Sequence, residues 1–195
     1  MLQSKLQQVF DKYNGTLPTK VAVAEGINKE SLRKACLRGD IEKQIRGVYV
    51  FPEAFYDDYF ALHSIYSKGI YSHESALLLH EYTTFSPFQY YMTFPKSYNA
   101  HQVRQNNIQP IYTVTSYYEL GVTKVKSWFG NTVWVYDKER TILDMLASKH
   151  ASQSTIEEMW DNYLMDEDKD FNRLYEYADK MNRQKLLEER NIAFA

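Results

Sequence analysis

The stretch from residue 17 to residue 50 constrains the fold of this chain most strongly. Within it, Ala22 and Gly26 are four residues apart. This spacing suits a small residue where two short helices touch and a glycine in the tight turn between them. Residues 41–50 then read as a small β-hairpin that turns at Arg46-Gly47. Two short helices followed by a hairpin predict a winged helix-turn-helix.

The predicted motif has two faces of different chemistry. Apolar side chains fall where such a unit has its core: Val21, Ile27, Leu32 and Ala35. Basic side chains fall on the other side of the second helix: Lys29, Arg33, Lys34 and Arg38. Asn28 is placed to cap that helix, and Gly39 is placed to end it. A basic helix followed by a basic hairpin indicates contact with duplex DNA.

Eight residues are predicted to contact DNA: Lys20, Lys29, Glu30, Arg33, Lys34, Arg38, Lys43 and Arg46. In this motif the start of the second helix and the residues one turn later reach base edges. That rule assigns four of the eight to the major groove: Lys29, Glu30, Arg33 and Lys34. Arginine can bind guanine through two hydrogen bonds. Glu30 either accepts a hydrogen bond from cytosine or caps the helix, and the cap is the favoured role.

The remaining four residues are predicted to hold the DNA backbone. Lys20, Arg38 and Lys43 are assigned to phosphate, a contact that gives affinity without sequence information. Arg46, in the wing, either enters the minor groove or rests on the backbone. Gly47 is expected to serve the turn beside it.

Charge is distributed unevenly along the chain. The net charge of the whole protein is −2. Residues 1–50 contain nine Lys or Arg and five acidic residues, a net charge of +4, whereas the remainder contains 14 and 20, a net charge of −6. A basic N-terminal part followed by an acidic remainder is expected when only one domain binds phosphate groups.

The length of 195 residues is enough for one large or two small domains. We predict an α+β protein with a winged helix-turn-helix domain at residues 1–52 and a mixed α/β domain at residues 53–195. The second domain is expected to have a small sheet and a helical C-terminal tail. Its helices and strands are predicted near residues 55–66, 72–80, 89–94, 109–115, 121–129, 132–136, 142–146, 156–164 and 171–181.

Three stretches of the chain carry a family resemblance by their order and spacing. The first is the winged motif ending in Arg46-Gly47-Val48-Tyr49, and the second is the segment Tyr71–His80. The third is Gly130-Asn131, which leads through a strand into Glu139–Met145. Together they resemble the AbiEi-type antitoxins of type IV toxin–antitoxin and abortive-infection systems. Glu25 departs from the helix-turn-helix pattern, which usually has an apolar residue at that place.

The resemblance implies a function in phage defence. Proteins of this kind use the N-terminal winged helix to bind inverted repeats in their own promoter and repress their operon. The C-terminal antitoxin domain counteracts a nucleotidyltransferase-like toxin encoded alongside, and a stable complex with the toxin is not expected. The alternative is a transcriptional regulator with a ligand-sensing second domain and no toxin partner.

An enzyme is the third hypothesis, and it depends on two groups of polar residues in the second domain. His73 and His80, with Glu74 nearby, suggest a metal site, but such a site needs three or four converging ligands and a third is not evident. A packed or hydrogen-bonded pair of histidines is therefore favoured. Ser72 is explained as a helix cap. A second group, Glu139, Arg140 and Asp144, is interpreted as support for a helix, with Arg140 and Asp144 paired on the surface. We therefore expect no catalytic residue, cofactor or metal.

The remaining features favour ordinary packing. Cys36 is interpreted as a small core side chain, with a redox sensor as the alternative. The aromatic residues of the C-terminal tail form either a core or a dimer surface: Trp160, Tyr163, Phe171 and Tyr175. No secretion signal or membrane-spanning run is evident, so a cytoplasmic location and no membrane partner are expected.

Overall fold

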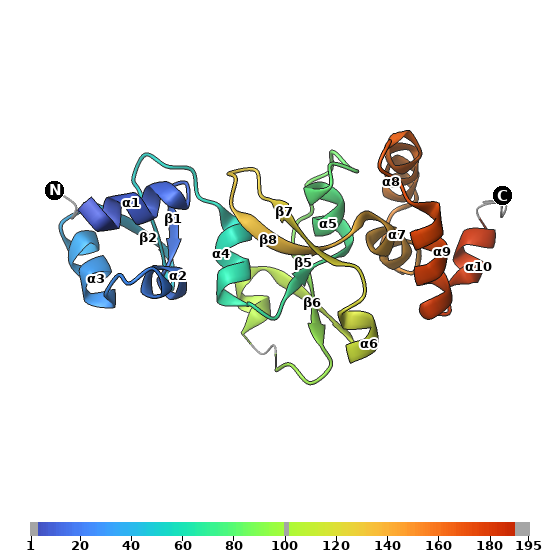
Figure 1. Ribbon diagram of the computed structural model, residues 1–195, viewed down its shortest axis with the longest axis horizontal. Coiled ribbons are helices and arrows are strands. Elements are labelled where there is room, and N and C mark those ends of the chain that lie inside the picture. The colour runs from blue at the N-terminus through green and yellow to red at the C-terminus, as the bar shows by residue number, and fades with distance from the viewer. Residues whose placement is uncertain (1–3, 100–101, 190–195) are drawn as a thin grey trace. The chain divides into compact units, whose positions relative to one another are not determined.

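The structure is a computed structural model that describes residues 4–99 and 102–189. It contains helices and two sheets, so the α+β class predicted from the sequence is correct (Figure 1). The chain divides into two compact units. The first comprises the described residues up to Ser67 together with Lys126–Val133, and the second comprises the other described residues. The first unit is thus larger than the predicted domain of residues 1–52.

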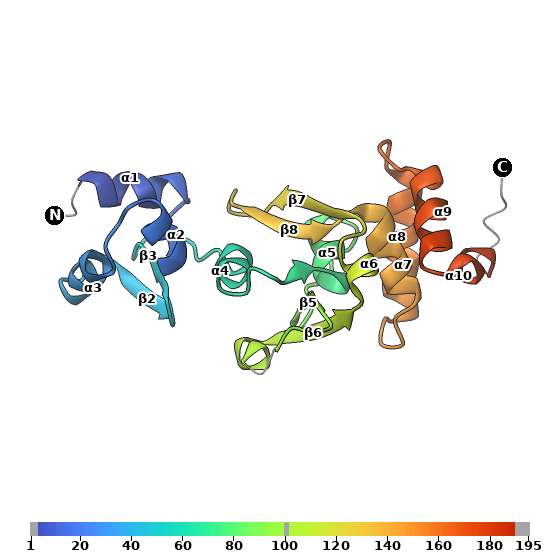
Figure 2. The same ribbon diagram turned by 60° about the horizontal axis from the view of Figure 1, so that its bottom comes forward.

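The first unit combines helices with a three-stranded antiparallel sheet in the order β1-β3-β2. Its elements are α1 (Ser4–Lys12), β1 (Thr16–Pro18), α2 (Thr19–Ala24), α3 (Lys29–Leu37), β2 (Glu42–Ile45), β3 (Val48–Val50) and α4 (Asp58–Ile65). The hairpin of β2 and β3, visible in Figure 2, was predicted, whereas β1 was not. Pro18 is both the last residue of β1 and the N-cap residue of α2.

The core of the first unit brings together apolar side chains of the helices and the sheet. Its buried members are Leu6, Val9, Phe10, Leu17, Ala22, Ile27, Leu32, Ala35 and Ile41. Three of the four core residues predicted in the motif are among them, and Val21 is only partly buried at the edge. Cys36 also packs against this core and is half-buried.

The connection between α2 and α3 has the geometry that its sequence predicts. Gly26 has φ +77°, a conformation that other residues rarely adopt. The backbone N–H of Ile27 donates to the carbonyl of Ala22 at 2.9 Å, which closes the turn behind α2. Asn28 caps α3 by accepting from the backbone N–H of Glu30 at 2.9 Å. Gly39, with φ +79°, follows the end of α3, as predicted.

Lys126–Val133 belongs to the first unit because of a buried polar cluster. Asp57 accepts hydrogen bonds from Ser127 and from Asn131, and its other carboxylate oxygen caps α4 through the N–H of Phe60. Asn131 also donates to the carbonyl of Tyr13 at 3.1 Å. Ser127 and Asn131 lie at least 70 positions from these partners in sequence, so no local pattern predicts the cluster.

The second unit contains most of a five-stranded sheet in the order β6-β5-β4-β8-β7. β4 pairs with β5 antiparallel and with β8 parallel, and β5 pairs with β6 parallel. The strands are β4 (Ile70–Tyr71), β5 (Tyr90–Pro95), β6 (Ile108–Thr113), β7 (Val122–Lys126) and β8 (Thr132–Tyr136). The strands predicted near residues 89–94, 109–115, 121–129 and 132–136 are present as β5, β6, β7 and β8, whereas the two-residue β4 was missed.

Helices precede and follow the strands of the second unit. They are α5 (His73–Leu79), the 3-10 helix η1 (Val103–Asn106), α6 (Thr115–Tyr118), α7 (Lys138–Leu146), α8 (Gln153–Met165), α9 (Phe171–Lys180) and α10 (Gln184–Glu188). Tyr163 is fully buried in the core, and Trp160, Phe171 and Tyr175 pack against it. The aromatic residues of the tail are therefore core, as favoured. Across the described ranges, no helix is long and apolar enough to cross a membrane.

Candidate nucleic-acid interface

All eight residues predicted to contact DNA are exposed in the first unit. Five of them lie on α3 or directly after it: Lys29, Glu30, Arg33 and Lys34 on the helix, with Arg38 next. Leu32 and Ala35, on the other side of α3, are both 0% exposed. The two-faced helix inferred from the sequence is therefore correct, and its exposed side carries the basic residues.

Four of the basic side chains lack a hydrogen bond or ion pair within the described part of the chain, although the charge of Lys34 helps to lower the pKa of the Glu30 carboxyl. No hydrogen bond or ion pair joins the side chain of Lys29, Lys34, Lys43 or Arg46 to any residue that the structure describes. Two of them lie on α3, one on β2, and Arg46 lies in the turn between β2 and β3, next to Gly47 with φ +85°. Exposed cations without intramolecular partners are available to phosphate groups.

The other three basic side chains are held by neighbours. Arg33 donates to Glu30 from Nε at 2.9 Å and from Nη2 at 2.7 Å. Arg38 pairs with Asp40 at 2.7 Å, and Lys20 donates to the hydroxyl of Ser67 at 2.9 Å. These contacts are exposed and hold each side chain only weakly.

The favoured role of Glu30 as a helix cap is wrong. Its carboxylate accepts from Arg33, one helical turn away, because residues three apart lie on the same face of a helix. The hydrogen bonds from Arg33 lower the pKa of the Glu30 carboxyl. The side-chain cap of α3 comes from Asn28 instead.

Glu25, which departs from the helix-turn-helix pattern, has a structural role at the end of α2. Its carboxylate accepts from Nζ of Lys12 and from the hydroxyl of Tyr13, both at 2.7 Å. These hydrogen bonds lower the pKa of Glu25. They connect the end of α1 to the turn that precedes α3.

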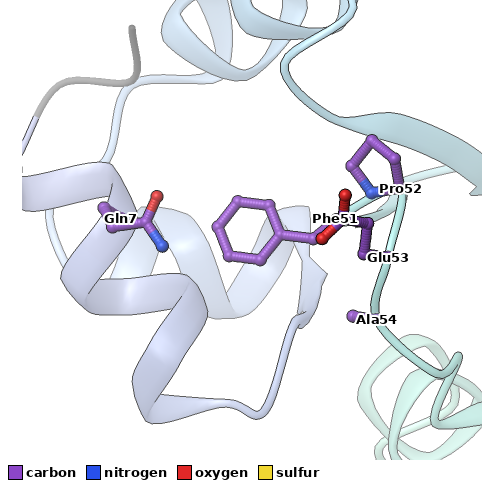
Figure 3. Close-up of a pocket in the computed structure, with 5 residues that line it drawn as sticks. All are labelled: Gln7, Phe51, Pro52, Glu53 and Ala54. Atoms are coloured by element: carbon purple, nitrogen blue, oxygen red, sulfur yellow. The ribbon is translucent and has the colours of Figure 1, made fainter.

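A shallow pocket of about 410 Å³ lies elsewhere on the first unit. Figure 3 shows the ring of Phe51 pointing toward Gln7, with Pro52, Glu53 and Ala54 along the other side. None of the eight residues predicted to contact DNA lines it. It is therefore separate from the candidate interface.

His73 and His80, the two histidines considered as metal ligands, have different surroundings, and no hydrogen bond joins them. His80 Nε2 lies 2.7 Å from the carbonyl of Tyr136, whereas Nδ1 of His73 is buried without a partner among the described residues. Burial lowers the pKa of both side chains. In the described ranges, no three His, Cys, Asp or Glu side chains are grouped to hold a metal ion. Ser72 precedes α5, but its hydroxyl accepts from Thr93 and does not cap the helix, contrary to the prediction.

Arg140 and Asp144 form the predicted ion pair, but the pair is buried and not on the surface. Arg140 Nε donates to Asp144 at 3.0 Å, and the two side chains are 2% and 4% exposed. Arg140 also donates to the carbonyls of Tyr117 and Leu120, which satisfies the buried guanidinium. Glu139 accepts from the hydroxyl of Tyr163. Through these contacts Glu139, Arg140 and Asp144 support α7, the structural role inferred from the sequence.

Comparison with known proteins gives a likeness of fold. No protein-family model matches the sequence, and the search of curated proteins found no match. Among solved structures, the chain is similar to the RV2827C protein from Mycobacterium tuberculosis, with a TM-score of 0.56 and 11% identity. The alignment covers 96% of this chain and 72% of that chain. At this identity the likeness concerns the fold alone.

Proposed function

We propose that the first unit is a winged helix-turn-helix domain and that α3 and the β2–β3 hairpin bind duplex DNA. The observation that carries the proposal is the set of exposed cations that form no hydrogen bond or ion pair with the described residues: Lys29, Lys34, Lys43 and Arg46. They lie on the helix and on the hairpin, the two elements that a winged helix-turn-helix presents to DNA. The turn at Gly26 and the cap at Asn28 support the same interpretation.

With the resemblance to AbiEi-type antitoxins, DNA binding leads to a specific cellular role. The chain is proposed to be the antitoxin and transcriptional autorepressor of a type IV toxin–antitoxin operon. Its functional partner is a nucleotidyltransferase-like toxin, and the transferase activity belongs to that toxin and not to this chain. A second candidate function, a regulator that senses a ligand, is favoured by a pocket of the second unit that Glu74 lines.

The test is binding of the purified chain to its own promoter in a gel-shift assay. Arg33→Ala with Lys34→Ala is expected to abolish the shift, because both side chains are exposed on α3 and neither supports the core. The matched control is Lys96→Ala with Lys185→Ala, which removes two exposed lysines of the second unit. Binding by the α3 variant at the wild-type level would refute the proposal that α3 is the helix that contacts DNA.

The cellular role has its own test. Expression of the neighbouring toxin gene is expected to stop growth unless this chain is present. A promoter that the chain represses, without any toxic neighbour, would favour the ligand-sensing regulator. Absence of both promoter binding and growth rescue would contradict the proposal as a whole.

A further inference from the structure

The second unit contains a pocket of about 540 Å³ that DNA binding does not explain. Its walls come from the start of α5, the loop that leads into β5, the first residues of β5, and the region where α8 begins. Figure 1 shows these elements. The volume lies in the range of ligand sites, about 300–1,000 Å³. The lining residues that matter here are Glu74, Phe85, Phe88, Tyr91, His150 and Glu158.

Glu74 is the unusual group in this pocket. The residue is only 9% exposed, and its Oε2 has no hydrogen-bond partner among the described residues. A buried carboxylate oxygen without a donor costs free energy that a bound donor would recover. Burial raises the pKa of the Glu74 carboxyl, although a hydrogen bond from its own backbone N–H and the nearby His150 act in the opposite direction.

The other lining groups restrict the chemistry of the missing donor. No described Lys or Arg lines the pocket, and its basic lining group is the imidazole of His150. Glu158 is a second carboxylate whose hydrogen bonds from Thr83 and Thr84 lower its pKa. This charge pattern repels phosphate and other anions. Phe85, Phe88 and Tyr91 provide aromatic faces, which attract cations. Phe88 is 90% exposed and Phe85 is 51% exposed, so their rings remain available for contact.

We propose that this pocket binds a small organic cation whose guanidinium or ammonium group donates to Glu74 and packs against the aromatic side chains. The charge complementarity and the unsatisfied Oε2 carry this assignment. It goes beyond DNA binding by the first unit, and its test does not use DNA, so that the two proposals can fail separately.

The test is calorimetric titration of the full chain with butylguanidinium and with butylurea, a neutral molecule of nearly the same shape. Butylguanidinium is expected to bind one site, and butylurea at least tenfold more weakly. Glu74→Gln should weaken butylguanidinium binding at least tenfold, whereas Glu119→Gln, an exposed carboxylate outside the lining, should leave it unchanged. Phe88→Ala should weaken binding several-fold, and its high exposure makes it a variant that keeps the core intact.

Four outcomes would overturn the proposal. They are the absence of saturable butylguanidinium binding at millimolar concentration, equal binding of butylurea, an unaffected Glu74→Gln variant, and tighter binding of a nucleotide such as AMP. A Gly-Arg-Gly peptide with blocked termini tests whether the cation is an arginine side chain of a protein partner. Binding of the peptide without binding of butylguanidinium would assign the pocket to a protein partner and overturn the assignment to a small ligand.

Discussion

Glu30 and Arg33 form a two-point contact on the exposed side of α3, with Arg33 Nε at 2.9 Å and Nη2 at 2.7 Å from the carboxylate oxygens. The contact occupies two donors of the arginine that is predicted to read a base. It also places a negative charge on the face proposed to meet DNA. Under the proposed function, Glu30 is therefore expected to weaken the binding of α3 to DNA.

Replacing Glu30 with Gln is expected to strengthen promoter binding by about fivefold at low salt. The substitution keeps the shape and removes a charge whose repulsion of a nearby phosphate is on the order of 1 kcal/mol. Fluorescence anisotropy with labelled promoter DNA measures the change, and Glu119→Gln is the matched control. If affinity falls instead, Glu30 accepts a hydrogen bond from a base, and our account of the pair is wrong.

The β2–β3 hairpin, the wing, is expected to contribute part of the salt dependence of DNA affinity. Lys43→Ala with Arg46→Ala should make the slope of log K against log salt shallower by about 0.9 for each phosphate that these side chains neutralise. Titrations between about 50 and 200 mM salt provide the slope. The Lys96→Ala, Lys185→Ala protein should retain the wild-type slope. An unchanged slope in the wing variant would exclude the hairpin from the interface.

The exposed basic face could be predicted from sequence because it depends on local signals. Asn28 and Gly39 mark the ends of α3, and the helical period separates Leu32 from Arg33 and Lys34. The two short strands could not be predicted in this way. β1 and β4 have three and two residues, too few for a period, and they exist because of their pairing with distant strands.

Burial of a charged residue depends on partners that the local sequence does not show. Arg140 and Asp144 have the spacing of a surface pair, but Tyr117 and Leu120 supply the carbonyl groups that allow Arg140 to be buried. The pocket at Glu74 has the same origin, since its lining comes from three separate segments of the chain. Tertiary contacts determined both features.

Removing the carboxylate of the buried pair is expected to destabilise the protein strongly. Asp144→Ala leaves Arg140 without its counter-charge and also removes the ion pair with Arg183 at 2.7 Å. Breaking a buried pair in this way costs about 3–5 kcal/mol. Chemical denaturation measures the change. Glu176→Ala removes an exposed pair with Lys180 and should change the free energy of unfolding by less than about 0.5 kcal/mol. Similar destabilisation of the two variants would contradict the importance of burial.

Asp137, which caps α7, is expected to make stability depend on pH. Burial raises the pKa of its carboxyl from 3.8 to about 6, although the N–H of Arg140 and the hydroxyl of Tyr177 donate to it. The folded protein therefore binds this proton more tightly than the unfolded chain does. The stability that the proton provides is complete below about pH 3.8 and is lost as the pH rises through about 6.

Asp137→Asn keeps an oxygen that can cap the helix and removes the charge. The wild type should lose stability as the pH rises from 4 to 8, and the variant should not lose this contribution. The free energy of unfolding of the variant minus that of the wild type should therefore increase by about 1–3 kcal/mol over this range, at roughly 1.4 kcal/mol per pKa unit and allowing for solvent screening. Urea denaturation at both pH values provides the difference. Tyr177→Phe removes a hydrogen bond that lowers the pKa of Asp137, so it should extend the pH-dependent window upward. If the stability of Asp137→Asn and of the wild type changes with pH in the same way, the prediction is wrong. A carboxyl whose pKa is the same in the folded and unfolded states does not make stability depend on pH.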